Sequence, residues 1–374
     1  MKQFIDRIYT LPNATDRFPA MEGLRAYAAL LIFIVHYFDT FSRSILGIDL
    51  NTQTLGSVQD PVTGAVFYLF ASHYGVDLFF FLSGFLIYRI VSRSGFSYPV
   101  FVKRRLLRIY PTFLASLFVW ACVRIPIHHA YPFDLTQLLG NLMFLNAIPA
   151  LGITPYNAVT WSLFYEFVFY LLFPAILLLP GHKRSLGPWH VIGFGILFIY
   201  VAMNINPYLI RFMMFFGGAL MASLRPKQLA GLALRIPDSL VIVCYLASTA
   251  WFSFLLSYQK FIPVFLVTSF LLVLKVLYGN GLLNRIFMLR WFRYLGNISY
   301  SFYLLHGLAI ELVMGHLAKY FMELGMTAYL VFTFGLALLL AVVFSTVLFL
   351  LTEKPYFTRK QHDFSAREGV GATA

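Results

Sequence analysis

Long apolar segments recur along the whole chain, and they restrict its fold more than any other feature. The 374 residues are 60% hydrophobic and only 11% charged, whereas soluble domains carry about 25% charged residues. An apolar run of about 20 residues is long enough to cross the hydrocarbon core of a bilayer as a helix. The sequence therefore predicts an all-α, polytopic membrane protein, a transmembrane helix bundle of about ten spans.

The predicted spans are the apolar runs between clusters of polar and basic residues. They cover residues 21–41, 62–91, 110–127, 160–180, 189–205, 208–224, 237–256, 261–278, 296–320 and 327–352. No small-residue cleavage site follows the first run, so we expect it to be a retained span. Residues 1–358 are predicted to form one transmembrane domain, and residues 359–374 a polar, disordered cytoplasmic tail.

The distribution of basic residues predicts the orientation, because cytoplasmic loops are enriched in Lys and Arg. With ten spans and both termini cytoplasmic, 21 of the 28 Lys and Arg residues lie inside, and three lie outside. The remaining four lie within spans: Arg25, Arg124, Arg211 and Lys275. If the short apolar segment Leu135–Leu151 crossed the membrane, every later loop would change sides. We therefore predict a short re-entrant or interfacial helix there, on the outer side.

Several classes of partner are not predicted. The net charge of +13 is spread between apolar segments rather than over one soluble face, so nucleic acid is not expected. The histidines show no metal-ligand spacing with cysteines or acids, and no nucleotide-binding glycine loop is present. The two cysteines, Cys122 and Cys244, both lie in apolar spans and are read as free thiols. No metal or permanently bound cofactor is predicted.

Two ionisable residues of the first span, Arg25 and His36, are candidates for function because such groups are costly in hydrocarbon. Eleven helical steps separate them, or about 16 Å, which is roughly half the hydrocarbon thickness. The fourth predicted span enters the membrane from the outer side. This places Glu166 at a depth similar to that of His36. A carboxylate beside an imidazole is a common arrangement for a general base. The alternative is that each residue only makes a hydrogen bond to a neighbouring helix.

The cytoplasmic loop before the third span carries Arg105 and Arg108, three residues apart and so on one helix face. Arginine matches phosphate oxygens well, and these two residues are candidates for binding an anionic cofactor. The alternative is that they only set topology or contact lipid headgroups.

Four further polar residues are candidates for lining a channel: Asp77, Ser83, Tyr303 and His306. Asp77 lies within the second span and needs a partner, for which Arg25 is one choice. Ser83 and Gly84 also fit a close helix–helix contact, the more common role of small residues in lipid. For His306, a structural hydrogen bond is an equally good explanation.

Six short motifs occur in this order: Arg25-x10-His36, Gly75–Phe85, Arg105-x-x-Arg108, Trp161-Ser162-Leu163-x-x-Glu166, Ser299–His306 and Glu353-Lys354-Pro355. In these motifs the chain resembles the acyltransferase family 3 membrane proteins, over nearly its whole length. The resemblance implies that Arg25 and His36 are essential and that Arg105 and Arg108 help to bind acyl-CoA. Some members of this family carry an additional esterase-like domain, which is not expected here.

Two functions therefore compete at the level of sequence. As an enzyme, the protein would be an O-acetyltransferase of the bacterial inner membrane that moves an acyl group, by default acetyl, from cytoplasmic acyl-CoA to an extracytoplasmic hydroxyl. The expected acceptor is a carbohydrate, free or lipid-linked, such as O-antigen or another envelope polysaccharide; peptidoglycan, a secreted glycan or a macrolide are alternatives. As a proton-coupled transporter, it would use His36, Glu166 and Asp77 as a relay. The arginine pair and the family resemblance favour the enzyme.

Overall fold

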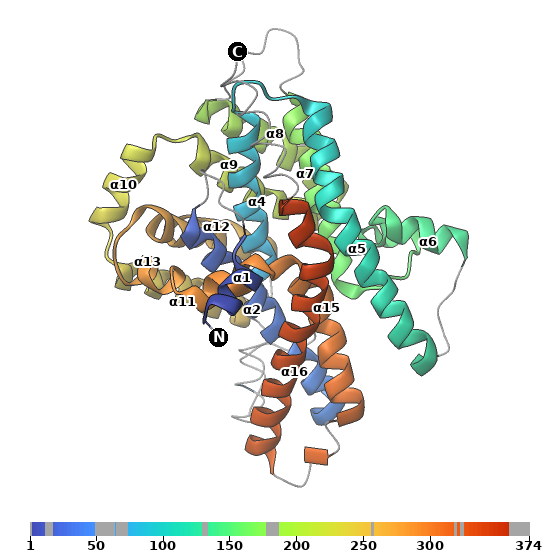
Figure 1. Ribbon diagram of the computed structural model, residues 1–374. Coiled ribbons are helices and arrows are strands. Elements are labelled where there is room, and N and C mark those ends of the chain that lie inside the picture. The colour runs from blue at the N-terminus through green and yellow to red at the C-terminus, as the bar shows by residue number, and fades with distance from the viewer. Residues whose placement is uncertain are drawn as a thin grey trace. The chain divides into compact units, whose positions relative to one another are not determined.

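All regular secondary structure in the described part of the chain is helical (Figure 1). The structure is a computed structural model that describes residues 2–11, 18–48, 64, 74–128, 134–176, 187–255, 258–317, 320–321 and 325–358. No strand occurs among these residues, which agrees with the predicted all-α class. The polar segment 359–374 and His73 lie outside the described residues.

Several helices are long and apolar enough to cross a membrane. In the described part of the chain there are six, or up to eight if two bent helix pairs each count as one span. The protein is thus an integral membrane protein by helix length and composition, with fewer qualifying spans than the ten predicted. Two predicted spans fall on helices outside this count, because α4 (Gly75–Val91) has 17 residues and the apolar stretch of α11 (Asp238–Leu255) is shorter than a full span.

The chain forms two compact units, and the larger one comprises residues 20–98 and 165–293. Besides α4 and α11, it contains α2 (Pro19–Phe41), η1 (Ser42–Leu46), most of α7 (Trp161–Ala175), α8 (Pro188–Ile205), η8 (Pro207–Arg211), α9 (Phe212–Ser223), α10 (Pro226–Arg235), α12 (Tyr258–Tyr278) and α13 (Leu282–Phe287). At its centre, α4 packs along α9 (Figure 1).

Glycines bring α4 and α9 unusually close together. A Cβ atom at Gly84 would clash with the carbonyl oxygen of Phe215, and one at Gly218 would clash with that of Phe81. Small residues commonly allow such approaches in membranes, where helices gain no hydrophobic energy by leaving lipid. The predicted close-contact role is therefore confirmed for Gly84. Stacked rings surround this crossing; Phe215, for example, lies 4.5 Å from Phe80 between ring centroids.

The second unit comprises residues 1–19, 99–164 and 294–374. Its elements are α1 (Lys2–Tyr9), α5 (Tyr98–His128), α6 (Leu135–Leu142), the short turns η4 (Leu145–Ala147), η5 (Pro149–Leu151) and η6 (Ala158–Thr160), the end of α14 (Arg290–Asn297), α15 (Ser299–Leu312), η9 (Val313–Leu317), α16 (Met326–Leu348) and η11 (Phe349–Glu353). α15 packs along α16 (Figure 1).

Side chains donate to backbone carbonyls at several places in this second unit. The indole of Trp120 and the amide of Asn157 both donate to the carbonyl of Leu304, at 3.0 and 2.8 Å. Lys354 donates to the carbonyls of Arg7 and Ile8 at the end of α1. The carbonyls of Arg7 and Ile8 lie in the last turn of α1, where backbone carbonyls have no partner within the helix. Leu304 lies in the interior of α15, so its carbonyl accepts these bonds from the side of the helix.

Helix α6 is too short to cross a membrane. Its eight residues span about 12 Å, against a hydrocarbon thickness of about 30 Å. Asp134 caps its start by accepting from the backbone of Gln137 at 2.7 Å, and the amide of Asn141 ties it to the carbonyl of Thr154 at 2.8 Å. The segment Leu135–Leu151 therefore consists of short helices and turns. It is not a continuous membrane-spanning helix.

Candidate functional site

The two candidate residues of the first span, Arg25 and His36, both lie on α2 and are half-buried. Their helix is approached closely by two other backbones. A Cβ atom at Gly23 would clash with the carbonyl of Phe287, and one at Gly75 would clash with the carbonyl of Ala28. Gly75 is the first residue of the Gly75–Phe85 motif. It thus allows α4 to contact α2 closely at a turn that lies between Arg25 and His36.

The carboxylate of Glu166 is held by two hydroxyl groups. Ser83 Oγ on α4 donates to Glu166 Oε1 at 3.1 Å, and Tyr170, one turn later on α7, donates to Oε2 at 2.9 Å. The structure therefore brings together Ser83 and Glu166, two residues that the sequence singled out separately. Each oxygen of the carboxylate can accept a further hydrogen bond, because it has a second lone pair. The predicted pairing of Glu166 with His36 therefore stays a prediction.

Asp77 is completely buried, and its partners are not the one considered from sequence. Its Oδ1 accepts from the hydroxyl of Tyr258 at 2.5 Å and lies 3.5 Å from Arg211 Nη1. The guanidinium of Arg211 in turn lies 4.0 Å from the ring centroid of Tyr258. The suggestion of Arg25 as the partner of Asp77 is therefore corrected to Arg211 and Tyr258. A buried charge needs such pairing because desolvation is costly.

The arginine pair Arg105 and Arg108 lies on α5, half-buried, and next to aromatic rings. The guanidinium carbon of Arg105 is 5.2 Å from the ring centroid of Phe101, and that of Arg108 is 5.8 Å from Phe357. The hydroxyl of Tyr300 donates to the carbonyl of Ile109 at 3.1 Å. Side chains from α15 and from the end of the last helix thus fix the turn that carries both arginines.

The two candidates on α15, Tyr303 and His306, are both buried. The hydroxyl of Tyr303 donates to the carbonyl of Val159 at 2.5 Å and shares a 2.7 Å hydrogen bond with Ser162. The Nδ1 atom of His306 lies 3.1 Å from the carbonyl of Phe302 in its own helix. These bonds are consistent with a structural role for both residues, in which each makes hydrogen bonds within the helix bundle. A channel-lining role stays a prediction.

Sequence reasoning assigned no role to Glu353, although it lies in one of the six motifs. Glu353 is 3% exposed, and its Oε1 accepts from both the backbone nitrogen and the hydroxyl of Ser301, at 3.2 and 2.5 Å. The last two motifs therefore meet within one unit. Arg211 and Lys275 were likewise given no role, although an ionisable residue within a span was a sufficient signal to single them out.

Comparisons with known proteins agree with the resemblance of the motifs. Residues 18–346 match the family model of acyltransferase family 3, described as an acyltransferase domain. A curated relative, Acyltransferase MdmB of Streptomyces mycarofaciens, is 30% identical over 180 residues, which cover 44% of this chain and 40% of the relative. No solved structure matches this chain. Because the family match covers most of the sequence, including five of the six motifs in full, the protein belongs to acyltransferase family 3.

Proposed function

We propose that the protein is a membrane O-acyltransferase that moves an acyl group from cytoplasmic acyl-CoA to a hydroxyl on the outer side of the membrane. Acetyl is the proposed acyl group. The proposed acceptor is an extracytoplasmic glycan, free or lipid-linked, such as O-antigen or another envelope polysaccharide of a bacterium. Lipopolysaccharide modification is thus one specific form of the proposal.

The family match over residues 18–346 is the observation that carries this proposal. It includes Arg25, His36, the arginine pair and Glu166, which supports reading them as parts of one machinery. The curated relative carries the name acyltransferase, and it adds support over 180 residues.

We assign the chain ten spans in a bacterial inner membrane, with both termini in the cytoplasm. Six helices meet the length criterion, two bent pairs add two spans, and α4 and α11 supply the last two. Each of the ten apolar runs in the sequence falls on one of these helices. Residues 135–151 then form a re-entrant or interfacial segment on the outer side, supported by the short length of α6.

Each candidate residue has a proposed role. His36 is the base that removes the proton from the acceptor hydroxyl, because a hydroxyl is a weak nucleophile and imidazole titrates near working pH. A transient acyl-imidazole on His36 is the alternative route. Glu166 orients the imidazole. Arg105 and Arg108 bind the phosphates of acyl-CoA, and Arg25 lies along the path of its pantetheine arm.

The test is acyl transfer by the purified full-length protein, with the surface glycans of a deletion strain analysed by mass spectrometry to identify the acceptor. The His36→Ala variant should insert normally and lose transfer by orders of magnitude. His190→Ala, which changes an exposed histidine on α8, is the matched control and should keep activity. Near-normal turnover of His36→Ala would refute its role, and absence of any acyl transfer or acyl-CoA hydrolysis by the wild type would favour the transporter.

A further inference from the structure

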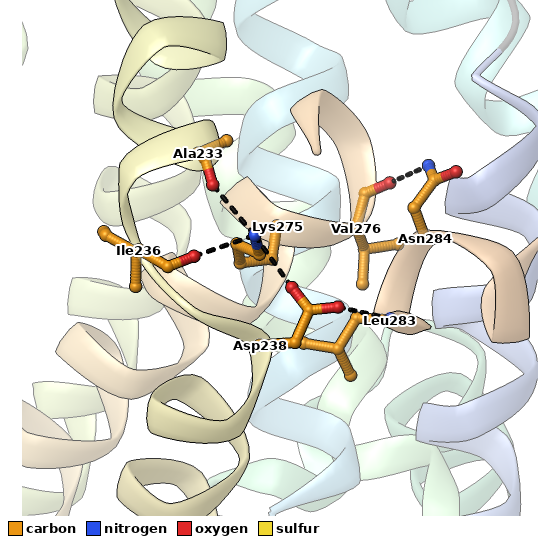
Figure 2. Close-up of polar contacts among 7 residues, drawn as sticks. All are labelled: Ala233, Ile236, Asp238, Lys275, Val276, Leu283 and Asn284. Carbon is orange, nitrogen blue, oxygen red and sulfur yellow. Dashed lines mark hydrogen bonds and ion pairs between the residues drawn. The ribbon is translucent and has the colours of Figure 1, made fainter. Parts of the chain in front are cut away.

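A buried lysine joins several helix ends of the larger unit (Figure 2). Lys275, near the end of α12, is 5% exposed. Its ammonium group donates to the carbonyls of Ala233 and Ile236, both at 2.8 Å, and to Asp238 Oδ1 at 2.7 Å. An ammonium group has three donors, and all three are used. Lys275 thus fixes the end of α10 and the start of α11 to α12.

The other oxygen of Asp238 extends this connection to α13. Asp238 Oδ2 accepts from the backbone nitrogen of Leu283 at 3.0 Å (Figure 2). A Cβ atom at Gly281 would clash with the same oxygen, so glycine is required for the approach. The amide of Asn284 donates to the carbonyl of Val276 at 2.7 Å. One ion pair therefore holds α10 and α13 at a common point.

Helix α10 turns away from α9 by 105°, so it lies across the direction of that helix. Its buried residues are Leu229 and Ala233. The side chains of Lys227, Arg235 and Leu234 are exposed, the last at 61%. The segment from Arg225 to Ile236 contains no acidic residue. This helix thus presents basic and apolar side chains together.

The segment that begins with α13 has the same composition. Leu282 is 58% exposed, Leu289 54% and Trp291 71%. Arg285 is exposed between them, and residues 282–293 contain no acidic residue. Exposed leucine and tryptophan beside arginine are typical of segments that lie in the membrane interface.

We infer that α10 and the segment 282–291, joined by the Lys275–Asp238 pair, form a surface that binds the headgroups of anionic phospholipids. Basic side chains near the membrane surface attract anionic lipids. A soluble phosphate compound would use the basic residues but would leave the leucines and Trp291 in water. A phospholipid accounts for both, since its acyl chains cover the apolar side chains. This binding is independent of the proposed acyl transfer.

The experiment measures the thermal stability of the purified full-length protein in nanodiscs of phosphatidylcholine, with and without phosphatidylglycerol. The wild type should be stabilised by phosphatidylglycerol, less so at high salt. In Lys227→Gln/Arg235→Gln, this stabilisation should fall by at least half. The matched control is Lys103→Gln/Arg104→Gln, an exposed pair of the same composition on α5, which should keep most of the effect. Equal losses in both variants, or none in either, would overturn the inference.

A second measurement keeps the inference testable if stability responds weakly. Lipids carrying a spin label near the headgroup should quench tryptophan fluorescence of the wild type more than that of Trp291→Phe, whereas a label deep in the acyl chain should not distinguish them. Inorganic phosphate at the same concentration should not reproduce the effect of phosphatidylglycerol. Stabilisation by inorganic phosphate alone, or quenching of Trp291 only by the deep label, would contradict binding of headgroups at this surface.

Discussion

Glu166 is the candidate residue whose surroundings suggest the most specific experiment, because Ser83 and Tyr170 each donate to one of its oxygens. A hydrogen bond to a charged group is worth about 1.5–3 kcal/mol, and 1.4 kcal/mol is about tenfold in rate. If Glu166 must be held to orient His36, Ser83→Ala and Tyr170→Phe should each lower kcat by about tenfold or more. Ser83→Thr, which keeps the hydroxyl, should restore much of the rate.

A double-mutant cycle separates this positioning role from a general loss of stability. In a Glu166→Ala background, Ser83→Ala should cause little further loss, since the group it positions is already absent. Tyr98→Phe is the matched control, because the hydroxyl of Tyr98 donates to the backbone of α7 at Leu171, at 3.0 Å, and not to Glu166. Equal losses for Tyr98→Phe and Tyr170→Phe would show that the hydroxyls only hold the helix.

The arginine pair allows a second prediction at the scale of single residues. If Arg105 and Arg108 bind the phosphates of acyl-CoA, replacing either by Ala should raise the KM for acyl-CoA about tenfold or more and change kcat less. High salt should weaken binding by the wild type. Arg104→Ala, which removes the same charge from an exposed neighbour, should have a smaller effect. Unchanged KM in both test variants would leave the pair as topology signals.

The sequence identified Asp77 as a residue that needs a partner, but not which partner. The cost of a charge in hydrocarbon applies to any helix, so it singles out the residue from its position in a span. Arg211, its partner, lies 134 positions away, and the choice depends on which helices are neighbours. Spacing within one span cannot supply that information. The same limit explains why the contact of Glu166 with Ser83 was not predicted.

At the scale of helices, the close crossing of α4 and α9 predicts a sensitivity to small increases in volume. Gly84→Ala places a methyl group against the backbone of Phe215, and backbone cannot give way as a side chain end can. Overpacking of this kind costs about 1–3 kcal/mol, so the thermal unfolding midpoint should fall clearly. Gly193→Ala in α8, where a Cβ atom meets open space, should leave it unchanged or slightly raised. Equal midpoints for the two variants would contradict the crossing.

Helix existence was predictable to a large extent, and helix direction was not. Apolar length alone locates helices, because an unpaired backbone is costly in lipid. The bend of 105° between α9 and α10 has a local cause in Pro226, which cannot continue the preceding helix. The 80° bend between α14 and α15 lies at Ile298, two residues after Gly296. An isolated glycine is also tolerated inside a helix, so it does not by itself predict a bend. A segment that was read as one span, 296–320, therefore begins in a separate helix.

At the scale of the molecule, the family match and the six motifs extend over both compact units. Arg25, His36 and Glu166 belong to the larger unit, whereas Arg105 and Arg108 belong to the other. The proposed reaction takes its donor from the cytoplasm and its acceptor from the outer side of the membrane. The orientation of the chain in the membrane is therefore a direct condition of the proposed function.

The orientation can be tested with single cysteines in a background where Cys122 and Cys244 are replaced by Ala. The predicted topology places Ala150 outside and Gly231 in the cytoplasm, and both positions are exposed. In a strain whose outer envelope admits the reagent, a thiol reagent that cannot cross the inner membrane should label Ala150→Cys in intact cells. It should label Gly231→Cys only after that membrane is opened. Labelling of both positions in intact cells would refute the ten-span topology, because α6 and α10 would then lie on the same side of the membrane. Labelling of Gly231→Cys but not Ala150→Cys in intact cells would place the arginine pair outside, away from acyl-CoA.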